Sequence, residues 1–225
     1  MTDAPKSPQD PERLEPSDAF ARLGQIMLAE ESLDSVLQRV ADLAMRTLPG
    51  ADEVSVTLIE GTKLRSAAFT GQRAIKLDER QYAAGFGPCL DAAEAGETFQ
   101  IRDTRTGDSP WPEFAGEAAH LGVLSTLSVG LPIAQRMIGA LNIYAARPGA
   151  FDDESVEHAR TFASYAAVAL ANASLYSSTA ELARNLREAM HSRAVIDQAK
   201  GILMERHSID AANGHSLLPD LRARA

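Results

Sequence analysis

Cys89 offers the chain's most reactive kind of nucleophile, and it is the only cysteine. It follows Gly87-Pro88, a pair that predicts the start of a helix. The N-terminus of a helix stabilises a thiolate, so a reactive cysteine is one interpretation. A small packed side chain is the other interpretation, and it is the one we favour. A single cysteine excludes an intrachain disulfide, which fits a reducing compartment.

The histidines and acidic residues do not form a recognisable metal or catalytic pattern. The histidines do not pair with one another, with cysteine or with a carboxylate at a distinctive metal-ligand spacing. No glycine-rich phosphate loop or catalytic triad motif is present, and Asp78-Glu79 is expected to be a solvated pair in a loop. We therefore expect no metal site and no enzymatic activity.

Aromatic and apolar residues between positions 82 and 124 are candidates for the wall of a ligand pocket. Such pockets are mostly apolar and contain a few polar groups, which Asp103, Arg105 and Asp108 can supply. Packing in the core explains the aromatic residues equally well. The candidate pocket residues are Tyr82, Phe86, Cys89, Asp103, Trp111, Phe114, His120 and Leu124.

The charge of the chain limits where a nucleic acid can bind. The formal net charge is −9, and residues 1–180 contain 15 basic and 25 acidic residues. Residues 181–225 contain 7 basic and 6 acidic residues, so only this segment lacks an acidic excess. Its RNA-binding candidates are Arg193, Lys200 and Arg206. The first two are seven residues apart and share a helix face. This face can contact RNA phosphates, or it is an ordinary charged flank of a coiled coil.

The N-terminal segment carries no targeting signal that we recognise. Residues 1–16 are polar and rich in proline, and we expect a disordered tail. They lack the basic and apolar regions of a signal peptide. No segment approaches the roughly 20 apolar residues of a membrane-spanning helix. We expect a cytoplasmic protein without membrane contact.

The elements that would position these residues alternate between helices and strands. Helical spacing over 20–43 predicts a helix capped by Ser17 or Asp18 and a second one capped by Ser32. Alternation over 54–69 and 123–146 predicts two hairpins, with a further short strand at 98–103. Hairpins make the sheet mainly antiparallel, so the fold class is α+β.

The segment between the first hairpin and that short strand has weaker signals. We expect residues 72–87 to be irregular and a short helix to span 88–95, between Pro88 and Gly96. Another helix is expected to begin near Pro112.

A long helix should follow the break at Pro148-Gly149, because no proline or glycine recurs before Gly201. Asp152 or Asp153 is its expected cap. Leucine or another apolar residue recurs every seven positions, which predicts a short dimeric coiled coil, although a helix folded back on the domain is an alternative. The dimer-interface candidates are Leu175, Leu182, Ile196 and Leu203.

Three stretches of the sequence resemble a GAF domain. They are GFGPCLDA at 85–92, the segment 103–133, and IGALNIYAARPGAFDDESVEHARTFASYAAVAL at 138–170. The resemblance covers about residues 17–178 and implies a GAF-like antiparallel sheet flanked by helices. It also implies a small-molecule signal, without naming the ligand or cofactor. Because some GAF domains attach a bilin through cysteine or sense redox state, it adds a further interpretation of Cys89.

A second resemblance lies in SRAVIDQAKGILMERHS at 192–208, which is similar to the first helix of an ANTAR domain. ANTAR domains are three-helix modules that bind paired RNA stem-loops and prevent transcription termination. The following residues, IDAANGHSLLPDLRARA, depart from the pattern of the second helix, and nothing corresponds to a third. We therefore expect a partial ANTAR segment at 192–225, joined to the GAF-like domain by a coiled-coil linker at 179–191.

Two functions follow from these resemblances and both stay open. The first is a homodimeric, signal-responsive regulator that binds RNA stem-loops and acts by antitermination. The second is a GAF module for dimerisation and ligand sensing whose RNA-binding end is no longer functional.

Overall fold

The computed structural model describes residues 14, 18, 21–22, 32–60, 63–134 and 137–207. The predicted disordered tail at 1–16 and the predicted first helix fall almost entirely outside these residues. The described elements are α2 (Leu33–Thr47), β1 (Glu53–Glu60), β2 (Lys63–Phe69), α3 (Gln72–Ala84), α4 (Pro88–Ala95), β3 (Thr98–Ile101), α5 (Pro112–His120), β4 (Ser125–Ala134), β5 (Met137–Ala145) and α6 (Asp153–His207).

The five strands form one sheet in the order β2-β1-β5-β4-β3, and every neighbouring pair is antiparallel. Both predicted hairpins are present, as β1–β2 and β4–β5. The long register between β1 and β5, from Glu53↔Tyr144 to Glu60↔Met137, joins the two hairpins at the centre of the sheet. The α+β prediction is confirmed.

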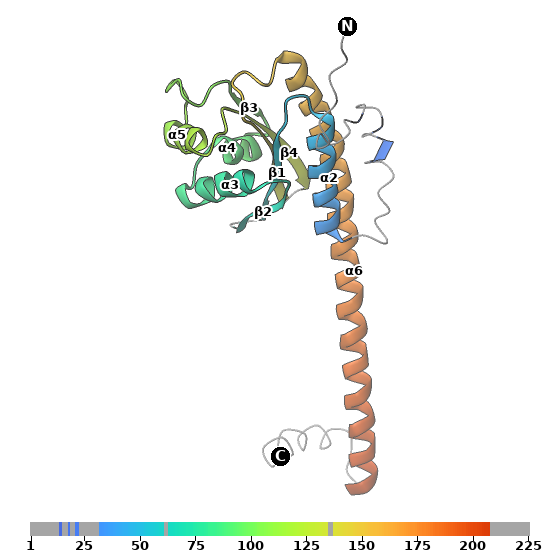
Figure 1. Ribbon diagram of the computed structural model, residues 1–225. Helices are drawn as coiled ribbons and strands as arrows, with labels where there is room; N and C mark the ends of the chain where they lie inside the picture. Colours follow the sequence, from blue (N-terminus) through green and yellow to red (C-terminus); the bar gives the residue numbers. More distant parts are fainter. Residues whose placement is uncertain are drawn as a thin grey trace. The chain divides into compact units, whose positions relative to one another are not determined.

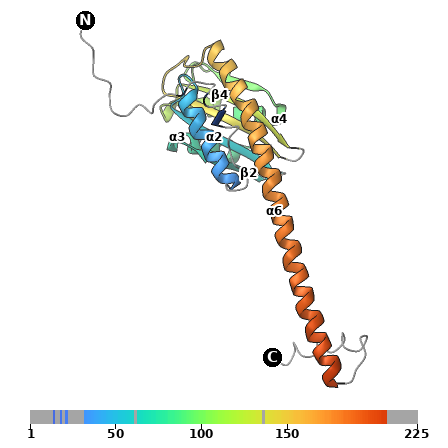
Figure 2. The same ribbon diagram turned by 90° about the vertical axis from the view of Figure 1, so that its right-hand side faces the viewer.

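Helix α2 and the first part of α6 cover one face of the sheet, as Figures 1 and 2 show. Ser32 caps α2 as predicted, because its hydroxyl accepts a hydrogen bond from the backbone N–H of Ser35. The strands turn alternate apolar side chains toward this face, among them Val56 and Ile143. They pack with Leu37 of α2 and Phe162 of α6 in one hydrophobic core.

Helices α3, α4 and α5 cover the opposite face of the sheet (Figure 1). Helix α4 begins at Pro88 and ends before Gly96, and α5 begins at Pro112, both as predicted. Helix α4 lies so close to β4 that a Cβ atom at Gly130 would overlap the carbonyl oxygen of Ala92. Glycine at this position therefore allows the close approach of helix and sheet.

Helix α3 corrects the prediction of an irregular segment at 72–87. Its buried residues, Ala74, Leu77, Asp78 and Gln81, follow helical spacing. Two of these four residues are polar, so a search for an apolar stripe does not find the helix.

The chain forms two compact units, Met1–Tyr176 and Ser177–Ala225, and α6 contributes to both. The helix has 55 residues, which confirms the prediction of one long C-terminal helix. Asp152 is its cap, since its carboxylate accepts hydrogen bonds from the N–H and the hydroxyl of Ser155. None of the described helices has a stretch long and apolar enough to cross a bilayer.

Candidate ligand-binding site

The middle of the sheet presents polar side chains to α3 and α4. Along β1 and β5, these polar residues alternate with the apolar residues that face α2 and α6. They are buried by helices instead of being exposed to solvent. Together with side chains from β2 and α3 they form what we call the Asp78 cluster: Ser55, Thr57, Ser66, Asp78, Tyr82, Asn142 and Tyr144.

Asp78 is the central acceptor of the cluster. Its carboxylate accepts hydrogen bonds of 2.7 Å from the hydroxyl of Ser66 and 2.7 Å from that of Tyr144. The side-chain amide of Asn142 donates to it over 3.4 Å. The donors come from two strands, β2 and β5, so the carboxylate ties α3 to the sheet.

The hydroxyl groups extend the network to β1. The hydroxyl of Tyr82 lies 2.9 Å from that of Thr57 and 3.1 Å from that of Ser66. The amide nitrogen of Asn142 lies 3.0 Å from the Thr57 hydroxyl and 3.3 Å from the Ser55 hydroxyl. The cluster is therefore continuous across β2, β1 and β5.

Burial shifts the proton affinities of the cluster. Desolvation raises the pKa of Asp78 to about 6, although the hydrogen bonds from Tyr144 and Ser66 oppose the shift. Desolvation, followed by the nearby charge of Asp78, raises the pKa of both tyrosine hydroxyls, Tyr82 and Tyr144, above the ordinary value. Asp78 is thus the group of the cluster that changes charge near neutral pH.

Cys89 lies at the start of α4, beside the cluster. Its side chain is buried, and desolvation raises the pKa of the thiol well above the ordinary value. Its backbone N–H donates a 2.9 Å hydrogen bond to the side-chain oxygen of Gln81, and a Cβ atom at Gly87 would overlap that same side chain. The environment therefore disfavours a thiolate, in agreement with the packed interpretation of this cysteine.

Trp111 connects α5 to α4. Its indole N–H donates a 2.8 Å hydrogen bond to the carboxylate of Asp91, and its ring meets that of Phe99 edge to face at 5.3 Å. Trp111 and Phe114 are buried in an apolar cluster that also includes Tyr144. Two of the predicted pocket aromatics therefore pack directly beside the Asp78 cluster.

A cavity of about 370 Å³ opens between α3 and α5. Its lining includes the apolar side chains of Phe86 and Phe114 and the buried amide of Gln81. An ion pair of 3.3 Å between Arg80 and Glu117 joins the two helices there. Since Gln81 follows Asp78 by three residues on α3, the cavity and the cluster are neighbours along one helix face.

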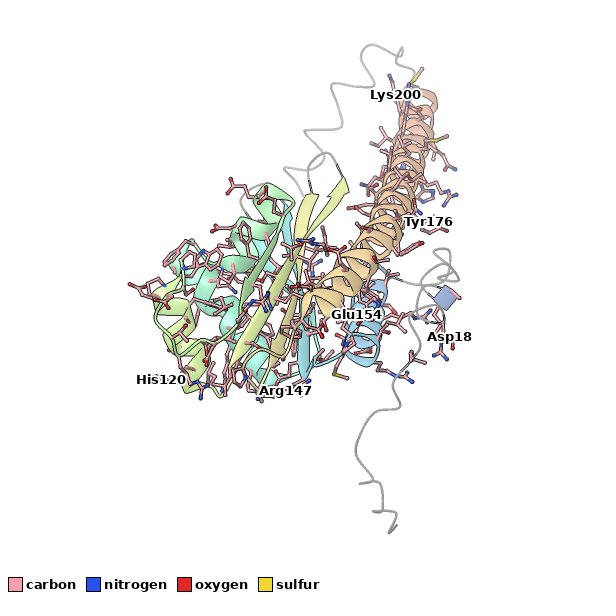
Figure 3. All side chains as sticks on the ribbon, turned by 90° about the horizontal axis from the view of Figure 1, so that it is seen from above. Asp18, His120, Arg147, Glu154, Tyr176 and Lys200 are labelled. Carbon is pink, nitrogen blue, oxygen red and sulfur yellow. The ribbon has the colours of Figure 1, made fainter. Side chains whose placement is uncertain are left out.

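Three predicted pocket residues lie elsewhere. Asp103 forms a close ion pair with Arg105, and the hydrogen bonds from this arginine lower the pKa of Asp103 to about 2. His120 is exposed at the end of α5, at the outer edge of the domain (Figure 3). Leu124 is half-buried, and its backbone bonds to Ala145 and Thr104 extend the edge of β4.

The RNA and dimer candidates all lie within α6. Figure 3 labels Lys200, near the end of this helix. The side chains of Leu175, Leu182 and Ile196 are 68%, 60% and 49% exposed. Arg193 and Arg206 are exposed and Lys200 is half-buried, while the side chain of Leu203 lies outside the described residues. Arg193 is 3.8 Å from Asp197, the distance of a weak ion pair.

Most of the Asp78 cluster is absent from the residues that the sequence singled out. Tyr82 was a candidate, whereas Asp78 was expected to be solvated and is fully buried. The available signal was the spacing of Ala74, Leu77, Asp78 and Gln81 on one helix face. Among the described residues, no group of His, Cys, Asp and Glu is arranged to hold a metal ion.

The comparisons with known proteins identify both parts of the chain. The family model of the GAF domain matches residues 30–171, so the chain belongs to the GAF family. The family model of the ANTAR domain matches residues 184–221. No curated protein is significantly similar to the chain.

Solved structures share the fold of the first unit. One is the phycoerythrobilin-bound GAF domain of a cyanobacterial phytochrome, 12% identical, with a TM-score of 0.54 over 72% of this chain and 97% of that one. Another is the GAF domain of a phosphoenolpyruvate-protein phosphotransferase from Coxiella burnetii, 20% identical, with a TM-score of 0.53 over 72% and 96%. A third is fRMsr of Staphylococcus aureus in its reduced form, 20% identical, with a TM-score of 0.53 over 69% and 94%. At these identities the likeness shows the fold.

The burial of Asp78 predicts an unusual pH dependence of stability. A carboxyl group whose pKa rises on folding stabilises the native state below its unfolded pKa, and this contribution is lost as the pH rises through about 6. The free energy of unfolding of Asp78→Asn should therefore rise by about 2 kcal/mol relative to the wild type between about pH 4 and about pH 7. Urea denaturation at a series of pH values measures this difference.

Glu79→Gln is the matched control, because it neutralises an exposed carboxylate at the next position of α3. Its curve should run parallel to that of the wild type. If Asp78→Asn also runs parallel to the wild type, Asp78 is not a buried, titrating group.

Proposed function

We propose that the chain is a signal-responsive transcription regulator that binds RNA and acts by antitermination, with a small-molecule signal received at the Asp78 cluster. The observation that supports this best is the joining of a GAF domain to an ANTAR domain in one chain. We assign the sensory role to residues 17–178, a linking role to 179–191 and RNA binding to 192–225. GAF and ANTAR domains are sensory and regulatory modules, so we propose no catalytic step.

Strand β5 is the proposed path by which the cluster affects α6. Asn142 and Tyr144 bond to Asp78 on one face of this strand. Leu141 and Ile143 belong, on the other face, to the hydrophobic core that includes Phe162 of α6. Packed cores do not deform continuously, so a change at Asp78 that moves β5 has to be accommodated by α6. A ligand that binds more tightly to one arrangement of β5 and α6 would shift the population toward that arrangement.

The second part of α6 exposes an apolar face that a partner can cover. It exposes Leu182, Leu186, Met190 and Ile196, and most of the stability of helices in proteins comes from packing of such a face. Leu182 and Ile196 are on one heptad position with Leu175, and Leu186 is on the adjoining one. We propose that a second copy of the chain covers this face as a parallel coiled coil.

We call this face, formed by the heptad positions of Leu182 and Leu186, the seam. The seam also contains two of the RNA candidates. Continuing the spacing of Thr179 and Leu186 by sevens leads to Arg193 and Lys200. In a paired helix these positions bring equal charges together, which opposes pairing. We infer that the heptad position of Leu175 and Leu182 stays paired through Ile196, whereas beyond Leu186 the second position is left open, so that Arg193 and Lys200 are available for RNA phosphates.

Aspartate on the seam should separate the two copies. Leu182→Asp combined with Ile196→Asp would bury unpaired charges in the coiled coil, at a cost of several kcal/mol. We expect light scattering at about 10 µM protein, well above a micromolar dissociation constant, to show a dimer for the wild type and a monomer for the variant.

Val195→Asp combined with Ile202→Asp is the control, since these residues are also seven apart and exposed but lie off the seam. This variant should stay dimeric. A wild type that is monomeric, or a control that dissociates equally, would contradict the proposed interface.

Removing a basic side chain should weaken RNA binding regardless of sequence. Arg193→Ala or Lys200→Ala removes one phosphate contact, so the slope of log affinity against log salt should fall by about one. Filter binding of a tandem stem-loop RNA over a salt series measures it. Arg187→Ala, an exposed arginine off this face, should have the smaller effect.

A dimeric wild type without measurable RNA affinity would decide against this function. It would support a GAF module that acts by dimerisation and ligand sensing alone.

A further inference from the structure

Asp78 is a buried acid without a basic partner in the part of the chain that the structure describes. No Lys, Arg or His there forms an ion pair with it, and its side chain has no exposed surface. Its hydrogen-bond donors are neutral hydroxyl and amide groups. When ionised, the cluster therefore carries an uncompensated negative charge, which is costly in a protein interior.

Two buried side-chain oxygens, one in the cluster and one next to it, have unused hydrogen-bonding capacity. The side-chain oxygen of Asn142 and the hydroxyl oxygen of Thr126 are buried and have no hydrogen-bond partner among the described residues. In the β4–β5 register Thr126 is opposite Tyr144, and Ser128 is opposite Asn142, so the two oxygens are diagonal neighbours on one face of the sheet. The nitrogen of Asn142 is already engaged with Thr57, Ser55 and Asp78. The Asn142 oxygen can only accept a hydrogen bond, and the Thr126 hydroxyl is able to accept one, so a ligand with N–H donors can satisfy both.

We infer that the Asp78 cluster binds a small cationic ligand with N–H donors, of the alkylammonium or guanidinium class. The positive charge pairs with the carboxylate of Asp78, and the N–H groups satisfy the oxygens of Asn142 and Thr126. This inference rests on the proposed sensory role of the cluster and specifies the chemistry of its signal.

The cavity between α3 and α5 is the proposed approach to the cluster. Its charged lining consists of two acids, Glu113 and Glu117, and one base, Arg80, so its net charge attracts a cation. The volume of about 370 Å³ falls within the range of small-molecule sites. The buried side chain of Gln81 lines the cavity three residues from Asp78 on the same helix. Entry then requires this side chain to release the N–H of Cys89.

Protons should compete with the cation for Asp78. The other titratable groups near this carboxyl are Tyr82 and Glu79 of α3, Cys89 of α4 and Tyr144 of β5, while β1 and β2 contribute only hydroxyl groups. The tyrosines and the cysteine stay neutral at and below neutral pH, because burial raises the pKa of each. A pKa near 6 for Asp78 makes cation binding about fourfold weaker at about pH 5.5 than at about pH 7.5.

Calorimetric titration of the full chain tests the inference. The probes are ethylammonium and methylguanidinium chloride, compared with sodium acetate and neutral acetamide at constant ionic strength. We expect saturable binding of at least one cation with one site per chain, and no binding of acetate. Asp78→Asn should weaken the cation by about tenfold or more and remove the pH dependence.

Two further variants separate binding from folding. Glu79→Gln removes the neighbouring exposed charge and should bind the cation as the wild type does. Thr126→Val removes one unpaired oxygen without changing the shape of the side chain, so it should fold and bind the cation a few-fold more weakly.

Three results would overturn the inference. Neither cation binds saturably, acetamide binds as tightly as the cations, or Asp78→Asn binds the cation as tightly as the wild type does. A chain that binds tandem stem-loop RNA but neither cation overturns this inference alone. A chain that binds a cation through Asp78 but has no RNA affinity overturns the proposed function and leaves the ligand class standing.

Discussion

The carboxylate of Asp78, buried between α3 and the centre of the sheet, is the group on which the inner half of the domain depends. Its bonds to Ser66 and Tyr144 come from β2 and β5, so a single side chain ties α3 to the middle and one edge of the sheet. Without these donors the charge would remain unsolvated in the interior, and without the charge several hydroxyl groups would lose their common acceptor. The position of α3 on the sheet and the hydrogen bonds from β2 and β5 to the carboxylate therefore depend on each other.

Strand β5 gives this arrangement a physical connection to the rest of the domain. Its two faces belong to different environments: Asn142 and Tyr144 contact the buried acid, while Leu141 and Ile143 pack in the core with α2 and α6. Helix α6 then continues into the ANTAR segment, as far as His207. The apolar and basic positions of that helix follow the same heptad repeat, so the proposed pairing of two copies and the proposed RNA contacts of Arg193 and Lys200 would be linked by sequence spacing. Strand β5 is thus the one element that has to move between the proposed sensory and RNA-binding parts.

The sequence predicted the elements that depend on local signals. Ser32, Pro88 and Pro112 marked helix starts, the alternation of Val54, Val56 and Leu58 marked a strand, and the absence of glycine and proline after 149 marked α6. The site was harder to predict, because alternation shows that a strand has a polar face but not what covers it. Ser55, Thr57 and Asn142 have the pattern of solvent-facing residues, yet α3 and α4 bury them. The prediction that Asp78 is solvated was wrong for the same reason, because the sequence does not show what covers this residue. Its burial depends on donors that lie up to 66 positions away in the chain, and no local pattern contains that information.

The central claim is that the state of Asp78 controls the RNA-binding end of α6. The most direct test is the dissociation constant of a tandem stem-loop RNA, measured for the wild type and Asp78→Asn between about pH 5.5 and about pH 7.5. The two proteins differ only at position 78, so the difference between the two profiles isolates Asp78. A coupling free energy typical of allosteric proteins predicts that the wild-type constant changes at least about fivefold more than that of the variant. Two parallel profiles would contradict the claim, because they would mean that the buried acid does not influence the RNA-binding segment.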